Sequence, residues 1–101
     1  MASIKVTKAS SVKSIKYQFK EDTGLTLRIY NGVKFADEKT KIVDIAKTDD
    51  PTGTLEIHGR TLIGNIETFF KDNFGIRVNI ANGKDTDLMD NRLSLAKAKR
   101  A

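Results

Sequence analysis

Apolar residues alternate with polar ones in two clear stretches of the chain, residues 25–30 and 76–81. In each stretch every second residue is Leu, Ile or Val, and this period of two is typical of a strand with one buried face. Two shorter alternations, at residues 3–7 and 54–58, indicate two more strands. The pattern therefore predicts four strands.

Each of the shorter strands is followed by apolar residues at helical spacing. They fall on one helical face: Val12, Ile15 and Phe19 after the first strand, and Ile63, Ile66 and Phe70 after the second. The pair Ser10-Ser11 precedes the first run and Thr61 the second, and Ser and Thr are good N-terminal caps because their side-chain oxygens accept from the free amides of the first turn. Gly24 and Gly75 follow, where a left-handed backbone can end a helix. The sequence predicts two helices, each between two strands.

An Asn-Gly pair follows each clear strand, at residues 31–32 and 82–83. This pair favours a type I′ hairpin turn, in which both central residues have positive φ. A return strand is expected at residues 33–35. Residues 84–86 have lost the apolar side chains, so no return strand is expected there.

A short helix is expected near the end of each half of the chain. The two ranges, 37–47 and 87–99, each begin with an aspartate, and a carboxylate is favoured near the positive end of a helix. Asp37 and Asp87 are therefore the expected caps. Between the halves, residues 48–53 are polar, rich in turn-forming residues and contain the single proline.

The second half of the chain repeats the first at an offset of 51 residues. Identical residues fall into line, as Ile15 does with Ile66, and apolar positions also correspond, as Ile42 does with Leu93. Repeats of this length usually form one unit that cannot cover its own apolar face and buries it against its copy. The duplication is informative about architecture rather than about activity.

The chain is expected to form one domain of the α+β class. The domain spans residues 1–101, with repeats at 1–50 and 52–101 that join at about 48–53. A strand-helix-strand unit closes right-handed with parallel strands, so two units can share one four-stranded sheet with the helices on one face. This arrangement is a ferredoxin-like split β-α-β fold. A grasp-type fold is the alternative, because residues 27–40 resemble the strand, turn and acidic helix of ubiquitin-like domains.

The second predicted helix and the strand after it resemble a signature of small uncharacterised bacterial proteins. The resembling segment runs from Gly59 to Gly75, continues to Gly83, and is echoed in the first half from Val12 to Gly32. Most of these positions are expected core or turn residues. The resemblance therefore implies a shared fold and carries over no activity, cofactor or site residue.

The composition narrows the classes of protein that this chain can belong to. The 101 residues include no cysteine, so the sequence offers no disulfide framework and no thiolate ligand. No segment near the N-terminus resembles a secretion signal, and none approaches the roughly 20 apolar residues of a membrane span. A soluble, cytoplasmic protein without a membrane partner is expected. Its net charge of +5, with basic residues gathered near both ends, would suit a polyanion, but such runs of charge more often serve only to keep the surface solvated.

No group of residues in the sequence forms a persuasive catalytic centre. His58 is the only histidine, and Glu56 is the acid expected beside it on the same strand face. The aspartates at 85, 87 and 90 lack the spacing of a calcium-binding loop, and the glycines recur as turn residues rather than in a phosphate-binding motif. We expect a protein that is not an enzyme and that uses no cofactor, metal or small-molecule substrate.

Protein association is the function that the sequence favours. The second predicted helix has a broader apolar stripe than the first, because Leu62, Phe69 and Phe74 add to it. A broad exposed stripe is a contact site for a protein partner or for a second copy of the chain. These three residues are therefore the expected interaction residues, unless the helix simply lies more centrally in the fold.

Nucleic-acid or polyanion binding is the alternative function. If the apolar residues of the clear strands point into the core, their polar neighbours form the opposite face of the sheet. Cations, an amide and a stacking ring are used by sheets that bind single-stranded nucleic acid. This face offers only one aromatic ring, where RNA-binding sheets typically use more than one. The expected binding residues are Lys5, Arg28, Tyr30, Arg77 and Asn79.

Overall fold

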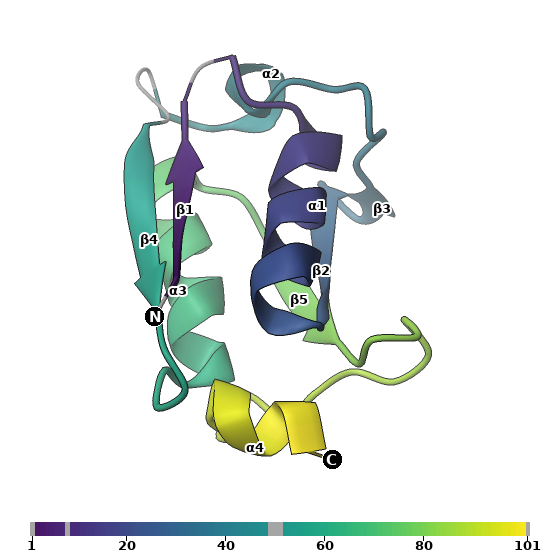
Figure 1. Cartoon of the computed structure of the whole chain (residues 1–101). Helices are drawn as coiled ribbons and strands as arrows, with labels where there is room; N and C mark the ends of the chain where they lie inside the picture. Colours follow the sequence, from purple (N-terminus) through teal and green to yellow (C-terminus); the bar gives the residue numbers. More distant parts are fainter. Residues whose placement is uncertain (1, 8, 49–51, 101) are drawn as a thin grey trace.

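The computed structural model of the chain describes residues 2–7, 9–48 and 52–100 (Figure 1). Of the predicted joint between the halves, residues 49–51 lie outside these ranges. The α+β class is confirmed. The elements within the described ranges are β1 (Ala2–Val6), α1 (Val12–Thr23), β2 (Thr26–Asn31), β3 (Lys34–Phe35), α2 (Ile42–Ile45), β4 (Gly53–Ile57), α3 (Ile63–Phe74), β5 (Val78–Ala81) and α4 (Leu95–Arg100).

The strands form two small antiparallel sheets rather than one sheet. β1 pairs with β4, and β2 lies between β3 and β5. The prediction of a single four-stranded sheet is therefore wrong, and neither the ferredoxin-like arrangement nor the grasp-type alternative is formed. Alternation along a strand shows which of its faces is buried, but it does not show which strand is the neighbour. Here the helix after β1 carries the chain across to the other sheet (Figure 1).

The two long helices connect the two sheets. Helix α1 packs against β1 in one sheet and β2 in the other, and α3 packs in the same way against β4 and β5. The predicted apolar stripes of both helices are buried and join the inward rows of the strands in one core. The short helices α2 and α4 lie at opposite ends of the molecule in Figure 1. Among the described residues, no helix has the length and apolarity that a membrane crossing needs.

Glycine ends both long helices as predicted, but the hairpin turn differs from the prediction. Gly24 and Gly75 have φ of 75° and 67° after α1 and α3, as a left-handed C-cap requires. The central residues of the observed turn are Gly32 and Val33, because Asn31 pairs with Lys34. Gly32 has φ of 70°, whereas neither Asn31 nor Val33 has positive φ, so the predicted type I′ turn is not formed. Positive φ at the first central residue alone is typical of a type II′ turn. In the second half the positive φ falls on Asp85, at 57°.

The helix starts agree with the predicted cap in one half only. Ser11 caps α1, because its hydroxyl accepts from the Ser14 amide at 3.1 Å while the Ser14 hydroxyl accepts from the Ser11 amide. Thr61 does not cap α3, because its hydroxyl accepts from the His58 amide at 3.0 Å. Leu62 occupies the N-cap position without a side-chain hydrogen bond.

Both strand pairings are centred on positions 51 residues apart. Ile4 faces Leu55 in the first sheet, and Arg28 faces Asn79 in the second. When 51 is added to the residue number in the first half and subtracted from that in the second, each pair becomes the pair on the other side of the centre. The pair Ser3–Glu56, for example, becomes the pair Thr54–Lys5. Each half contributes one strand to each of these pairings.

Backbone contacts near the short helices recur as well, at a longer offset. The Ile42 amide donates to the Ser10 carbonyl at 2.8 Å, and the Leu95 amide donates to the Thr61 carbonyl at 2.8 Å. Ser10 and Thr61 are 51 positions apart, whereas Ile42 and Leu95 are 53 apart. The predicted match of Ile42 with Leu93 is therefore wrong by two residues, because the connection in the second half is longer.

The two short helices are shorter than predicted, and their aspartates act in turns ahead of them. Asp37 Oδ1 accepts from the Lys39 amide at 2.9 Å. Its counterpart in the second half is Asp90, whose Oδ1 accepts from the Arg92 amide at 2.9 Å. The predicted cap Asp87 lies in the loop before this turn and caps no helix.

Candidate functional site

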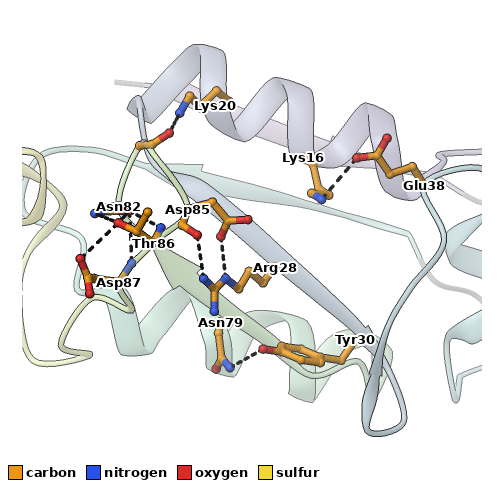
Figure 2. Close-up of polar contacts among 11 residues, drawn as sticks. Lys16, Lys20, Arg28, Tyr30, Glu38, Asn79, Asn82, Asp85, Thr86 and Asp87 are labelled. Carbon is orange, nitrogen blue, oxygen red and sulfur yellow. Dashed lines mark hydrogen bonds and ion pairs between the residues drawn. The ribbon is translucent and has the colours of Figure 1, made fainter.

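The outer face of the β3-β2-β5 sheet gathers most of the residues predicted for nucleic-acid binding. Leu27 and Ile29 of β2 are buried in the core, so Arg28 and Tyr30 point to the other side of the sheet. Asn79 projects from β5, opposite Arg28. Figure 2 shows Arg28, Tyr30 and Asn79 on this one side.

A second aromatic ring lies beside Tyr30. The hairpin register places Phe35 of β3 opposite Tyr30, with ring centroids 5.0 Å apart and ring planes inclined by 28°. This is a stacked geometry, and Phe35 is 64% exposed. The sequence predicts the return strand but only one ring on this face. The signal that places Phe35 here is the cross-strand pairing that a two-residue turn imposes.

Arg77 lies next to the aromatic pair. It immediately precedes β5, and its guanidinium carbon is 4.9 Å from the centroid of the Tyr30 ring, within range of a cation–π contact. Its carbonyl accepts from the Tyr30 amide at 3.0 Å, which fixes its backbone beside β2. The Tyr30 hydroxyl in turn accepts from Asn79 Nδ2 at 3.1 Å. The ring of Tyr30 is thus held at its face and at its hydroxyl.

Arg28 is held by the loop after β5. Its Nε donates to Asp85 Oδ1 at 2.6 Å, and its Nη2 donates to the Asp85 carbonyl at 3.1 Å. The hydrogen bond to this carboxylate raises the pKa of Arg28 further above its usual value. The guanidinium carbon also lies 6.0 Å from the centroid of the Phe35 ring. The Arg28 side chain is therefore only 20% exposed and its charge is balanced.

The loop that carries Asp85 is braced by its own hydrogen bonds. Asn82 Oδ1 accepts from the Thr86 amide at 2.8 Å, and Asn82 Nδ2 donates to the Thr86 hydroxyl at 2.9 Å. Lys20 of α1 donates to the Gly83 carbonyl, as Figure 2 shows. These contacts fix the position from which the Asp85 carboxylate reaches Arg28.

Lys5 lies apart from this group. Strand β1 belongs to the other sheet, where Lys5 is exposed and faces Thr54. The prediction that Lys5 shares a face with the other four residues is therefore wrong, because it assumed a single sheet.

We use the name aromatic face for Arg28, Tyr30, Phe35, Arg77 and Asn79.

The residues predicted for protein association do not form an exposed patch. Phe74 is fully buried, and Phe69 is partly buried against the core. Their rings meet edge to face with centroids 5.5 Å apart, and both lie close to Gly53 of β4. Leu62, at the start of α3, is 41% exposed. Two of the three added residues thus belong to the packing of α3 against the core.

His58 lies in a turn and makes its hydrogen bonds within that turn. Its Nδ1 accepts from the Arg60 amide at 3.1 Å, and its own amide donates to Thr61. The side chain is exposed just after β4, while Glu56 lies within the strand. In the part of the chain that the structure describes, no three His, Cys, Asp or Glu side chains are grouped to hold a metal ion.

Comparison with known proteins gives no guide to this site. No family model, no curated protein and no solved structure matches the chain. The resemblance to small bacterial proteins stays a prediction, and the aromatic face has to be interpreted from its geometry.

Proposed function

We propose that the protein is a non-catalytic module that binds single-stranded nucleic acid through the aromatic face. The observation that carries the proposal is the stacked pair of Tyr30 and the exposed Phe35, with a guanidinium group beside each ring. Nucleobases stack on such rings whatever their sequence, and neighbouring arginines contact the phosphates. Phe35 supplies the second ring that is typical of sheets with this function.

The residues of the aromatic face have different roles in this proposal. Phe35 offers a solvent-exposed ring to a base. Arg77 has no carboxylate within ion-pair distance among the described residues, so its charge is available to a phosphate. Arg28 is already balanced by Asp85, and we assign it to the support of Phe35 rather than to phosphate binding.

The charge of the chain supports the same partner. Its net charge of +5 attracts a polyanion at low salt. The affinity should fall as salt rises, with a logarithmic slope of about −0.7 for each phosphate that a protein cation contacts on a single strand.

The test is fluorescence anisotropy with a labelled single-stranded oligothymidylate at several salt concentrations. Phe35→Ser should weaken binding about tenfold, because the loss of one stacked base costs ~1–3 kcal/mol. Arg77→Gln should weaken binding and reduce the salt slope by about one phosphate contact. Phe35→Ser is informative because the residue is exposed and its removal leaves the core intact.

Lys5→Gln is the matched control for Arg77→Gln. It removes the same charge from an exposed position on the other sheet, so it should change the affinity much less. Equal losses for Lys5→Gln and Arg77→Gln would indicate unlocalised charge attraction. Unchanged binding by Phe35→Ser would contradict the proposed stacking.

Protein association is the second candidate function, now at the tip of the β2–β3 hairpin. Val33 is 89% exposed there, next to the exposed ring of Phe35. Exposed aromatic residues beside arginine are typical centres of protein interfaces. If light scattering finds an oligomer that Val33→Ser and Phe35→Ser both dissociate, and no oligonucleotide binds, this candidate replaces the first.

We also infer that the chain is built from two copies of one unit. Three observations support the inference: the pairing of Ile4 with Leu55, the pairing of Arg28 with Asn79, and the recurrence of the backbone contacts before α2 and α4. Because β1–β4 and β2–β5 each combine strands of both halves, neither copy completes a sheet alone.

A further inference from the structure

A cleft lies along α3 and β5, next to the aromatic face. Its volume is about 760 Å³, within the size range of ligand sites in proteins. Helix α3 contributes Glu67, Thr68 and Lys71 to its lining, Arg77 comes from the residue before β5, and Arg92 comes from the turn before α4. We call it the α3 cleft.

The α3 cleft has small side chains where the matching surface of α1 has large ones. Gly64 and Thr68 line it, and the residues 51 positions earlier are Lys13 and Tyr17. The Gly64 amide donates to the Asn91 carbonyl at 2.9 Å, which holds the turn before α4 against this side of the helix. The cleft is therefore a feature of the second half that the repeat pattern does not predict.

Two cations of the α3 cleft form no ion pair with any described residue, although the charge of Arg77 acts on the Glu67 carboxylate. The Lys71 ammonium makes no hydrogen bond or ion pair with any described residue, whereas its counterpart Lys20 donates to a main-chain carbonyl of the loop after β5. Arg77 has its guanidinium against the Tyr30 ring and forms no ion pair within the described ranges. Both charges can therefore contact a phosphate.

The lining holds one further charge of each sign, from Glu67 and Arg92. Glu67 is its single carboxylate, and burial raises the pKa of Glu67 while the charge of Arg77 lowers it to a smaller extent. Arg92 is bound to Asp90, with Nη2 and Oδ2 2.9 Å apart. The free charges of the cleft thus favour an anionic ligand, and Leu62 adds an exposed apolar side chain at the same site.

We propose that the α3 cleft is a second nucleotide subsite, which takes the phosphate and base that follow the bases stacked on the aromatic face. The inference rests on the proposed function. Arg77 links the two places, because it lines the cleft while its guanidinium lies 4.9 Å from the Tyr30 ring. In this proposal Arg77 and Lys71 contact the phosphate, and the base extends along α3 toward Leu62.

The test compares oligothymidylates of about three and about eight nucleotides, lengths below and within the range of such binding grooves. Thr68→Tyr places the corresponding α1 residue in the cleft without a change of charge. It should weaken binding of the longer strand about fivefold and leave the shorter one unchanged, because only the longer strand reaches the cleft. Lys71→Gln should act in the same direction, and Glu67→Gln should tighten the longer strand about twofold.

Lys13→Gln is the matched control for Lys71→Gln, because Lys13 is an exposed lysine of α1 outside the cleft. Thr68 and Lys71 are exposed, so their variants should unfold at the wild-type temperature. If both variants bind the longer strand like wild type while Phe35→Ser weakens both lengths, the subsite is refuted and the proposed function stands. If Phe35→Ser changes neither length, or neither strand binds wild type, both proposals fail.

Discussion

The two halves of the molecule share backbone contacts but differ in the side chains at corresponding positions. In the first half, Tyr30 and Phe35 face each other across β2 and β3. In the second half, Ala81 and Leu88 are joined by a bridge at the corresponding place. The same pairing therefore carries two rings in one half and two aliphatic side chains in the other.

This difference separates what the fold requires from what it tolerates. The bridge between Ala81 and Leu88 forms without aromatic side chains, so the pairing itself does not need the rings of Tyr30 and Phe35. The exposed ring of Phe35 is therefore not required by the backbone arrangement, which supports the proposed role in binding. The aromatic face and the α3 cleft both lie where the two halves differ.

The largest effect is expected in the core that both halves share. Phe19→Ala and Phe70→Ala should each lower the free energy of unfolding by ~3–5 kcal/mol, because each removes a fully buried ring. Phe70→Ala should lie at the upper end, since its ring also contacts Phe69 and Phe74 edge to face. Denaturant unfolding followed by circular dichroism measures both values. A loss below ~1 kcal/mol for either variant would show that α1 and α3 do not contribute to the core in the same way.

The next effect separates the two glycines that end α1 and α3. Alanine at either position should cost ~1–2 kcal/mol, because both have a left-handed backbone. Gly75→Ala should cost more than Gly24→Ala, since its added Cβ would lie 2.8 Å from Lys47 Cβ, whereas the nearest atom at Gly24 is 4.0 Å away. Thermal unfolding of the two variants checks the order. Equal losses would mean that the Lys47 side chain moves aside without cost.

A smaller effect is expected at the helix starts. Ser11→Ala should lower the stability by ~1 kcal/mol, because it removes the cap of α1. Leu62→Ser should raise it by up to ~1 kcal/mol, because α3 has no side-chain cap to lose. Chemical unfolding of both variants tests this contrast. A loss for Leu62→Ser as large as that for Ser11→Ala would show that the apolar contacts of Leu62 outweigh a cap.

The smallest effect concerns Glu67. The corresponding residue of the first half is Lys16, whose Nζ lies 3.5 Å from Glu38 Oε1. Burial raises the pKa of Glu67 above its usual value, and Arg77 opposes the shift. Because the folded-state pKa exceeds the unfolded one, this group stabilises the fold at low pH and the contribution is lost as the pH rises through the folded value.

Glu67→Gln should therefore gain stability relative to wild type as the pH rises from about 3 to about 7. The gain should stay below ~0.5 kcal/mol, because the side chain is partly exposed and screened by solvent. Unfolding curves of both proteins across this pH range measure the difference. A difference that does not change with pH would rule out the titration of Glu67 as its cause.

Local elements could be predicted from the sequence because their signals are local. The apolar spacing of residues 12–19 and 63–70 and the glycines after them place both long helices within a few residues. The sheet arrangement could not be predicted in this way, because the alternation in β1 and β2 is equally compatible with one sheet or two. The choice depends on how the helices pack between the strands, which involves residues far apart in the chain.

The candidate site could be predicted in part. Arg28, Tyr30 and Asn79 follow from alternation alone, because their apolar neighbours are buried. Phe35 requires knowledge of the hairpin register, and Lys5 was misplaced because its sheet was misassigned. The burial of Phe74 depends on its contact with β4, which the apolar stripe of a single helix cannot indicate.

The most direct test of the proposed function is an amide NMR titration of isotopically labelled protein with single-stranded oligothymidylate. The account predicts that chemical-shift changes concentrate on β2, β3 and the start of β5, at Tyr30, Phe35 and Arg77, and leave β1 and β4 unchanged. Changes of similar size on both sheets, or none on the β2–β3 hairpin at saturating oligonucleotide, would contradict it.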